Sequence, residues 1–76
     1  MDIQVIPAGF VKRYVPQPLL LSPTEWGGKA VNDLVMSLGI PATISLSILV
    51  NGEKQQKDYA LRAGDVVKLV PLMTGG

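Results

Sequence analysis

The stretch AVNDLVMSLGIP, residues 30–41, decides the fold because it predicts the main helix of the chain. Its apolar residues recur at the spacing i, i+3, i+4 and i+7, so that one stripe of the helix carries Val31, Leu34, Val35 and Leu38. Gly39 suits the left-handed position after a helix, and the proline at position 41 prevents continuation. We therefore expect a helix from about residue 29 whose apolar stripe packs against a sheet.

Three segments that follow the helix predict strands. Residues 44–50 alternate apolar and polar side chains, and Asn51-Gly52 comes next, the pair best suited to the positive φ angles of a tight hairpin turn. Residues 53–58 are polar and fit a short returning edge strand, after which Leu61 is expected to insert into the core. Residues 66–70, VVKLV, are apolar enough for a central strand.

Two segments before the helix also predict strands. Met1, Ile3 and Val5 alternate with polar residues, which is typical of a strand with one buried face, and residues 7–9 (PAG) end it. Residues 19–21, LLL, follow two prolines and predict a second core strand. Together these segments predict strands on both sides of the helix in sequence.

The remaining N-terminal segments are less regular. Residues 10–15 place apolar and charged groups on both faces of a strand, so an edge strand and an irregular excursion are both compatible with them. Residues 22–25, SPTE, have the form of a helix capping box, but Gly27 and Gly28 would interrupt a helix that began there. We expect a short turn before the main helix.

The resulting architecture is α+β, with one main helix on one face of a mixed sheet of four or five strands. A chain of 76 residues has room for one domain, which we assign to residues 1–70. Because Pro71 has no N–H to donate, the last strand should end near it, and residues 71–76 should project from the domain. Six extended residues reach about 20 Å, which is enough to enter the active site of another protein.

The composition excludes several kinds of function. The chain contains no Cys and no His, which removes thiol nucleophiles, imidazole bases and the usual zinc ligands, so we expect no metal site and no self-contained enzyme. Its net charge is +1 with scattered cations, which argues against nucleic-acid binding. No hydrophobic stretch is long enough for a bilayer, and no disulfide or leader pattern is present, so the expected location is the cytoplasm.

The terminal Gly75-Gly76 suggests a chemically used tail. The α-carboxylate of Gly76 would be its reactive group after an ATP-using partner converts it into an acyl-adenylate, and the two glycines would pass a narrow channel without side chains in the way. Small residues also collect at chain ends without any function. The position of the glycines, directly after a central strand and a proline, makes both interpretations reasonable.

Other candidates have simpler interpretations. Residues 27–30, GGKA, resemble part of a phosphate-binding loop but lack its first glycine and its Ser or Thr. Asp58 and Asp65 form a conceivable acid and base pair, although Asp65 after a glycine is more typical of a turn. Trp26 is expected to cover the edge of the core, with partner contact as the alternative. Met36 and Met73 are interpreted as apolar filling, with Met73 also able to contact a partner.

Four segments together resemble a known family. They are residues 30–41, residues 50–52 (VNG), residues 61–67 (LRAGDVV) and residues 71–76 (PLMTGG). In order and spacing they look like the small subunit of molybdopterin synthase and its relative, the thiamin sulfur carrier. The likeness extends over nearly the whole chain.

The resemblance implies a ubiquitin-like β-grasp fold and a sulfur carrier rather than an enzyme. The implied site is Gly76, adenylated by a partner related to ubiquitin-activating enzymes that uses ATP, and then converted to a thiocarboxylate. Gly75 is its implied neighbour in the partner's channel, and the implied docking stem is Pro71, Leu72, Met73 and Thr74.

The partner that accepts the sulfur depends on the branch of the family. The resemblance implies the large subunit of molybdopterin synthase, or thiazole synthase in the thiamin branch, and Pro71 favours the molybdopterin branch. Two alternatives stay open, a protein modifier that is conjugated through Gly76 and a non-covalent adaptor with an incidental tail.

Overall fold

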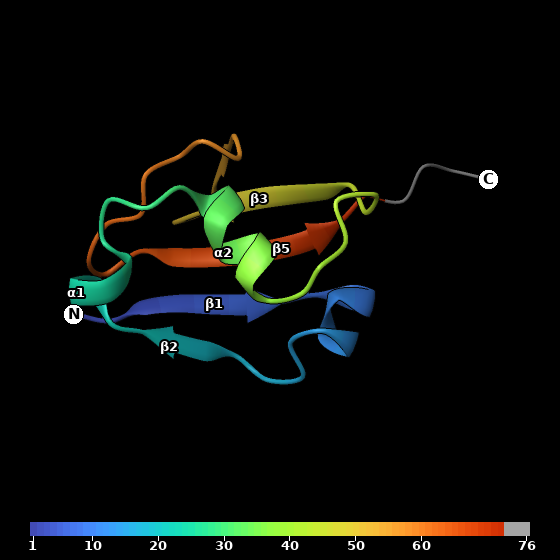
Figure 1. Ribbon diagram of the computed structural model, residues 1–76, viewed down its shortest axis with the longest axis horizontal. Helices are drawn as coiled ribbons and strands as arrows, with labels where there is room; N and C mark the ends of the chain where they lie inside the picture. The colour runs from blue at the N-terminus through green and yellow to red at the C-terminus, as the bar shows by residue number, and fades with distance from the viewer. Residues whose placement is uncertain (73–76) are drawn as a thin grey trace.

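A computed structural model of the chain describes residues 1–72. Figure 1 shows a single twisted sheet with the main helix lying across one of its faces. The strands and helices, in chain order, are β1 (Ile3–Pro7), η1 (Gly9–Arg13), β2 (Leu19–Leu21), α1 (Pro23–Trp26), α2 (Val31–Ser37), β3 (Leu46–Val50), β4 (Glu53–Gln55) and β5 (Val66–Pro71).

The five strands lie in the order β2-β1-β5-β3-β4. Strands β1 and β5 are parallel, with Val5 opposite Val67, and every other neighbouring pair is antiparallel. The apolar segment VVKLV therefore occupies the middle of the sheet, as predicted for a central strand. The predicted α+β architecture, one main helix on one face of a mixed sheet, is confirmed.

Helix α2 buries the predicted stripe and ends where the sequence indicates. Val31 and Leu34 are fully buried in the core. The chain turns away at Gly39, whose φ of 79° lies in the left-handed region that a glycine adopts most easily. Ile40 then folds back into the core and is also buried.

The turn between β3 and β4 also forms as predicted. Asn51 has φ 54° and Gly52 has φ 85°, so both central residues have the positive values that a two-residue hairpin of this kind requires. The strand before it begins at Leu46, two residues later than the alternation alone suggests. Residues 41–44 form a separate turn, closed by a 3.1 Å bond from the Ile44 N–H to the carbonyl of Pro41.

The segment of residues 10–15 is neither an edge strand nor irregular. Its first four residues belong to the 3₁₀ helix η1, which begins at Gly9 with a φ of 55°. Val11 and Val15 are both buried, and the N–H of Val15 donates to the carbonyl of Val11 at 3.0 Å. This four-residue spacing is helical, but only two buried apolar residues indicate it, which is too few to distinguish a helix from the sequence alone.

Two large apolar side chains, one in β2 and one in α2, are exposed. Strand β2 pairs only with β1, so it lies at the edge of the sheet. Leu19 and Leu21 pack against the core, as predicted for a core strand, whereas the middle residue Leu20 is 67% exposed. Met36 is 66% exposed on the outer face of α2, so its interpretation as core filling is wrong. Each of the two lies on the face of its element opposite the side chains that pack against the core.

Helix α1 is the predicted short turn before the main helix. Pro23 occupies its first turn, but Ser22 makes no side-chain cap hydrogen bond, so the capping box suggested by SPTE does not form. Both α-helices are short, and within residues 1–72 none has the length and apolar character needed to cross a bilayer.

Candidate functional site

The predicted site residues Pro71 and Leu72 lie at the end of the central strand. Pro71 is the last residue of β5 and lies opposite Leu46 of β3. Leu72 follows it and donates its backbone N–H to the carbonyl oxygen of Ser45 at 2.9 Å. The stem that is predicted to carry the reactive end therefore begins as part of the sheet.

Pro71 stays in the sheet because its position requires no N–H on the β3 side. In an antiparallel pair of strands, residues that exchange hydrogen bonds alternate with residues that do not. The bond between Leu72 and Ser45 marks their pair as hydrogen-bonded, so the neighbouring pair of Pro71 and Leu46 is not. The sheet thus continues past residue 70, although the division into a domain and a functional tail stays a prediction.

Gly9 packs against Pro71 from the other side. A Cβ atom built on Gly9 would lie 2.9 Å from Cγ of Pro71, which is closer than carbon atoms pack, and the φ of 55° also favours glycine. Next to this contact the N–H of Ala8 donates to the carbonyl of Leu69 at 3.0 Å. The start of η1 and the start of the predicted stem are therefore held together.

The other predicted tail residues, Met73, Thr74, Gly75 and Gly76, lie outside the described residues. Their assignment as the docking stem, the channel neighbour and the reactive end stays a prediction.

Asp65 is a structural residue at the start of β5. It is 5% exposed, and its carboxylate accepts hydrogen bonds from Asn51 Nδ2 at 3.0 Å, from the Tyr59 hydroxyl at 2.9 Å and from the backbone N–H of Arg62 at 2.9 Å. Both carboxylate oxygens are therefore engaged, whereas Asp58 is exposed to solvent. These bonds support the turn interpretation of Asp65 and argue against an acid and base pair.

Tyr59 is affected by this contact. Burial raises the pKa of the Tyr59 phenol, and the hydrogen bond to Asp65 and the negative charge of that carboxylate raise it further. The phenol therefore keeps its proton at neutral pH and acts as a hydrogen-bond donor. Among the described residues no group of three or more His, Cys, Asp or Glu side chains lies close enough to hold a metal ion.

The GGKA segment is not arranged as a phosphate-binding loop. Such a loop points free backbone N–H groups at the phosphate. Here the N–H of Gly28 donates to the carbonyl of Leu61 at 2.8 Å, and the N–H of Lys29 donates to the carbonyl of Trp26 at 3.1 Å. The Gly28 bond connects the chain before α2 to the loop before β5, and the Lys29 bond closes a turn back to the end of α1.

Trp26 covers the edge of the core, as expected. It is half-buried and packs against the core cluster. The ammonium group of Lys29 lies 5.0 Å from the centre of its ring, within the range of a cation–π contact.

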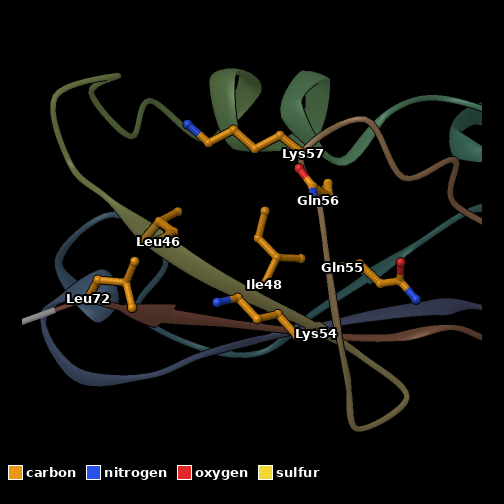
Figure 2. Close-up of a pocket in the computed structure, with 7 residues that line it drawn as sticks. All are labelled: Leu46, Ile48, Lys54, Gln55, Gln56, Lys57 and Leu72. Atoms are coloured by element: carbon orange, nitrogen blue, oxygen red, sulfur yellow. The ribbon is translucent and has the colours of Figure 1, made fainter.

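An open groove that no sequence pattern predicts lies beside Leu72. Figure 2 shows it between the β3–β4 edge of the sheet and α2. Its volume is about 700 Å³, and its lining includes Leu46, Ile48, Leu72, Lys54 and Lys57. These residues come from β3, from the segment around β4 and from the end of β5, so no local sequence pattern could have brought them together.

Comparisons with known proteins agree with this fold. The ThiS family model matches residues 22–76, which is more than half of the chain. No curated protein matches the sequence.

Three solved structures illustrate the similarity. A Pyrococcus furiosus protein assigned as subunit 1 of molybdopterin converting factor has a TM-score of 0.71 at 19% identity, over 96% of this chain and 99% of its own. SAMP1 from Haloferax volcanii has a TM-score of 0.71 at 19% identity, over 100% of both chains. A chain of the complex of subunits 1 and 2 of molybdopterin-converting factor from Helicobacter pylori 26695 has a TM-score of 0.61 at 20% identity, over 100% of both chains. At these identities the likeness establishes a shared fold.

Proposed function

The chain belongs to the ThiS family of ubiquitin-like sulfur carriers, which have the β-grasp fold, and we propose that Gly76 carries sulfur as a thiocarboxylate for molybdopterin synthesis. The family match carries this proposal, because it runs from residue 22 to residue 76 and so includes Gly75-Gly76 as well as the helix and the β3–β4 turn.

The proposed chemistry begins at the α-carboxylate of Gly76. A carboxylate oxygen attacks the α-phosphorus of ATP in a partner enzyme, pyrophosphate leaves, and an acyl-adenylate forms. A sulfur nucleophile such as hydrosulfide then attacks the carbonyl carbon, the bond to AMP breaks, and a thiocarboxylate remains. The chain has neither His nor Cys, so we assign ATP binding and proton transfer to the partners.

The structure supports a role as a carrier with a presented end. The predicted stem starts at Pro71, which is held between Leu46 and Gly9, and so leaves the sheet from its central strand. A rigid origin for the tail reduces the conformational entropy that is lost when a partner binds it.

The molybdopterin branch is favoured by two observations. Two of the similar structures carry the name of the molybdopterin converting factor, and one of them is a complex of its subunits 1 and 2. Pro71 is the second observation, since a proline at this place is frequent in that branch. The proposed partners are an adenylating enzyme related to ubiquitin-activating enzymes and the large subunit of molybdopterin synthase.

The test is the intact mass of the full chain after incubation with an adenylating enzyme, ATP and a sulfur source. We expect one oxygen atom to be exchanged for one sulfur atom. A variant without Gly76 should show no exchange, while its circular dichroism spectrum matches that of the full chain. The thiocarboxylate form should then convert a pterin precursor when the large subunit of molybdopterin synthase is added.

Three other outcomes would contradict parts of the proposal. No exchange with an adenylating enzyme that is active on its own carrier would end the sulfur-carrier assignment. If the thiocarboxylate sulfur is transferred only when thiazole synthase is the acceptor, the chain functions in the thiamin branch. Lysine adducts that survive boiling in reductant and require Gly76 would favour a protein modifier.

A further inference from the structure

Strand β3 has an open edge where its first residue lies. The ladder between β3 and β4 covers Ile48 to Val50 and leaves Leu46 outside it. After Gln55 the chain leaves the sheet, and the carbonyl of Lys57 accepts a 2.9 Å bond from the N–H of Asn32 near the start of α2. No strand of the described residues therefore lies beside Leu46 on that side.

The backbone of Leu46 points toward this open edge. Leu46 and Pro71 form a non-hydrogen-bonded pair, and in such a pair the N–H and C=O groups point away from the partner strand. The N–H and C=O of Leu46 consequently face the place where β4 would continue. One donor and one acceptor are available there for an added strand.

The groove beside Leu46 is apolar in its floor and positively charged at its rim. Leu46, Ile48 and Leu72 provide the apolar surface, and Leu72 is 48% exposed. Figure 2 shows the side chains of Lys54 and Lys57 extending from the β4 side toward the end of the groove where Leu46 and Leu72 lie. The remaining lining residues are two glutamines, so the part of the groove formed by residues 1–72 contains two positive charges and no carboxylate.

We propose that this groove binds an extended acidic segment of a partner protein as an added strand beside Leu46. The segment exchanges hydrogen bonds with the N–H and C=O of Leu46, in the manner of β-strand addition. An apolar side chain opposite Leu46 packs on the floor, and carboxylates two positions away on the same face interact with Lys54 and Lys57. This inference does not depend on the chemistry of Gly76.

A nucleic acid fits the groove less well than an acidic peptide. Two lysines provide a small phosphate-binding surface, and the net charge of the chain is only +1. Among the described lining residues there is no aromatic side chain on which a base could stack. The open backbone groups at Leu46, in contrast, match the donors and acceptors of a peptide strand.

The experiment selects peptides from a random phage-displayed library on the immobilised full chain. The expected peptides combine Asp or Glu with Val, Ile or Leu at alternate positions. In the complex with a selected synthetic peptide, the Leu46 amide resonance should move and its hydrogen exchange should slow. The K54E/K57E variant should bind that peptide at least about tenfold more weakly.

The K12E/R13E variant is the matched control. It changes the net charge by the same amount at two exposed positions of η1, away from the groove, and should bind the peptide with unchanged affinity. Equal weakening by both variants would reduce the effect to net charge and overturn the proposal. A library that yields no acidic peptides would overturn it as well.

Other occupants of the groove would be recognised by separate measurements. If deletion of residues 73–76 moves the methyl resonances of Leu46 and Ile48, the chain's own end occupies the groove. If these resonances depend on protein concentration, a second copy does. Tighter binding of single-stranded RNA than of the selected peptide, lost in K54E/K57E, would assign the groove to nucleic acid. Each of these results would overturn the proposal.

Discussion

Asp65 connects three parts of the chain through one buried carboxylate. Its partners are Asn51 in the β3–β4 turn, Tyr59 in the following loop and Arg62 just before β5. Asn51 also accepts a 3.0 Å bond from the N–H of Val66 through its side-chain oxygen. The carboxylate and the amide together fix the turn to the start of the central strand.

Replacement of this carboxylate should destabilise the fold. Asp65→Ala leaves three donors without their acceptor, and we expect a loss of about 2–3 kcal/mol in the free energy of unfolding. The exposed Asp58→Ala is the control and should change the free energy of unfolding by less than about 0.5 kcal/mol. Urea unfolding followed by Trp26 fluorescence measures both, and equal losses for the two variants would refute the role given to Asp65.

The ionisation of Tyr59 offers a second measurement. In a Tyr14→Phe background, only Tyr59 contributes to tyrosinate absorbance, and its titration midpoint should lie above the ordinary value of about 10. Asp65→Asn removes the negative charge that raises the pKa and should lower the midpoint. An unchanged midpoint in a folded Asp65→Asn variant would show that the carboxylate does not act on the phenol.

The same shift has a consequence for stability at high pH. The pKa of Tyr59 is raised in the folded state, so folding favours the protonated phenol. This contribution is fully present below the unfolded pKa of about 10, and it is lost as the pH rises through the folded pKa. Tyr59→Phe should therefore flatten the decline of stability in that range of pH.

Residue-scale contacts of this kind were only partly predictable. Asp65 after Gly64 indicates a turn, and the bond to the Arg62 N–H three residues away agrees with it. The bonds to Tyr59 and Asn51 bridge 6 and 14 residues, and no local pattern encodes them.

The elements with a repeated pattern were predicted well. Four apolar residues define the stripe of α2, and alternation together with Asn51-Gly52 defines β3 and its turn. In the segment around η1, only the buried Val11 and Val15 indicate helical spacing. The charged residues between and beside them hide this spacing, so the helix could not be predicted. An edge strand such as β2 is also difficult to recognise, because LLL has the composition of an internal strand while its position depends on the rest of the sheet.

The contact between η1 and β5 can be tested with two glycine variants. Gly9→Ala introduces a Cβ 2.9 Å from Pro71 at a positive φ, whereas Gly39→Ala introduces one at a positive φ with no atom within 4 Å. The backbone cost alone is about 1–2 kcal/mol for each. Gly9→Ala should lower the free energy of unfolding more than Gly39→Ala does, and it should shift the NMR resonances of Pro71. Equal losses of free energy together with unshifted Pro71 resonances would argue against the contact.

On the scale of the whole molecule, the sheet extends to Pro71, and Leu72 continues its hydrogen bonding by one further bond. A chain that ends at Val70 lacks the Leu72 bond to Ser45 and the contact between Pro71 and Gly9, while a chain that ends at Leu72 keeps both. We expect the longer chain to be more stable by about 1–2 kcal/mol. Thermal unfolding of the two truncations decides this, and identical midpoints would place the end of the stable body at residue 70.

The groove is the feature of the whole molecule that sequence patterns could not reveal. Leu46, Lys54 and Leu72 belong to three segments, and only the strand order places them around one opening. The predicted site, in contrast, rests on the chain's last residues and on the family to which the chain belongs.

The parallel pairing of β1 and β5 also determines how the molecule bears a mechanical load. Met1 lies at the end of the sheet opposite the end of β5, and the two strands run side by side in the same direction (Figure 1). A force that draws the two termini apart acts along these strands, so their hydrogen bonds are loaded together in shear and do not open one after another. A partner that pulls on the last residues would therefore meet a body that resists unravelling.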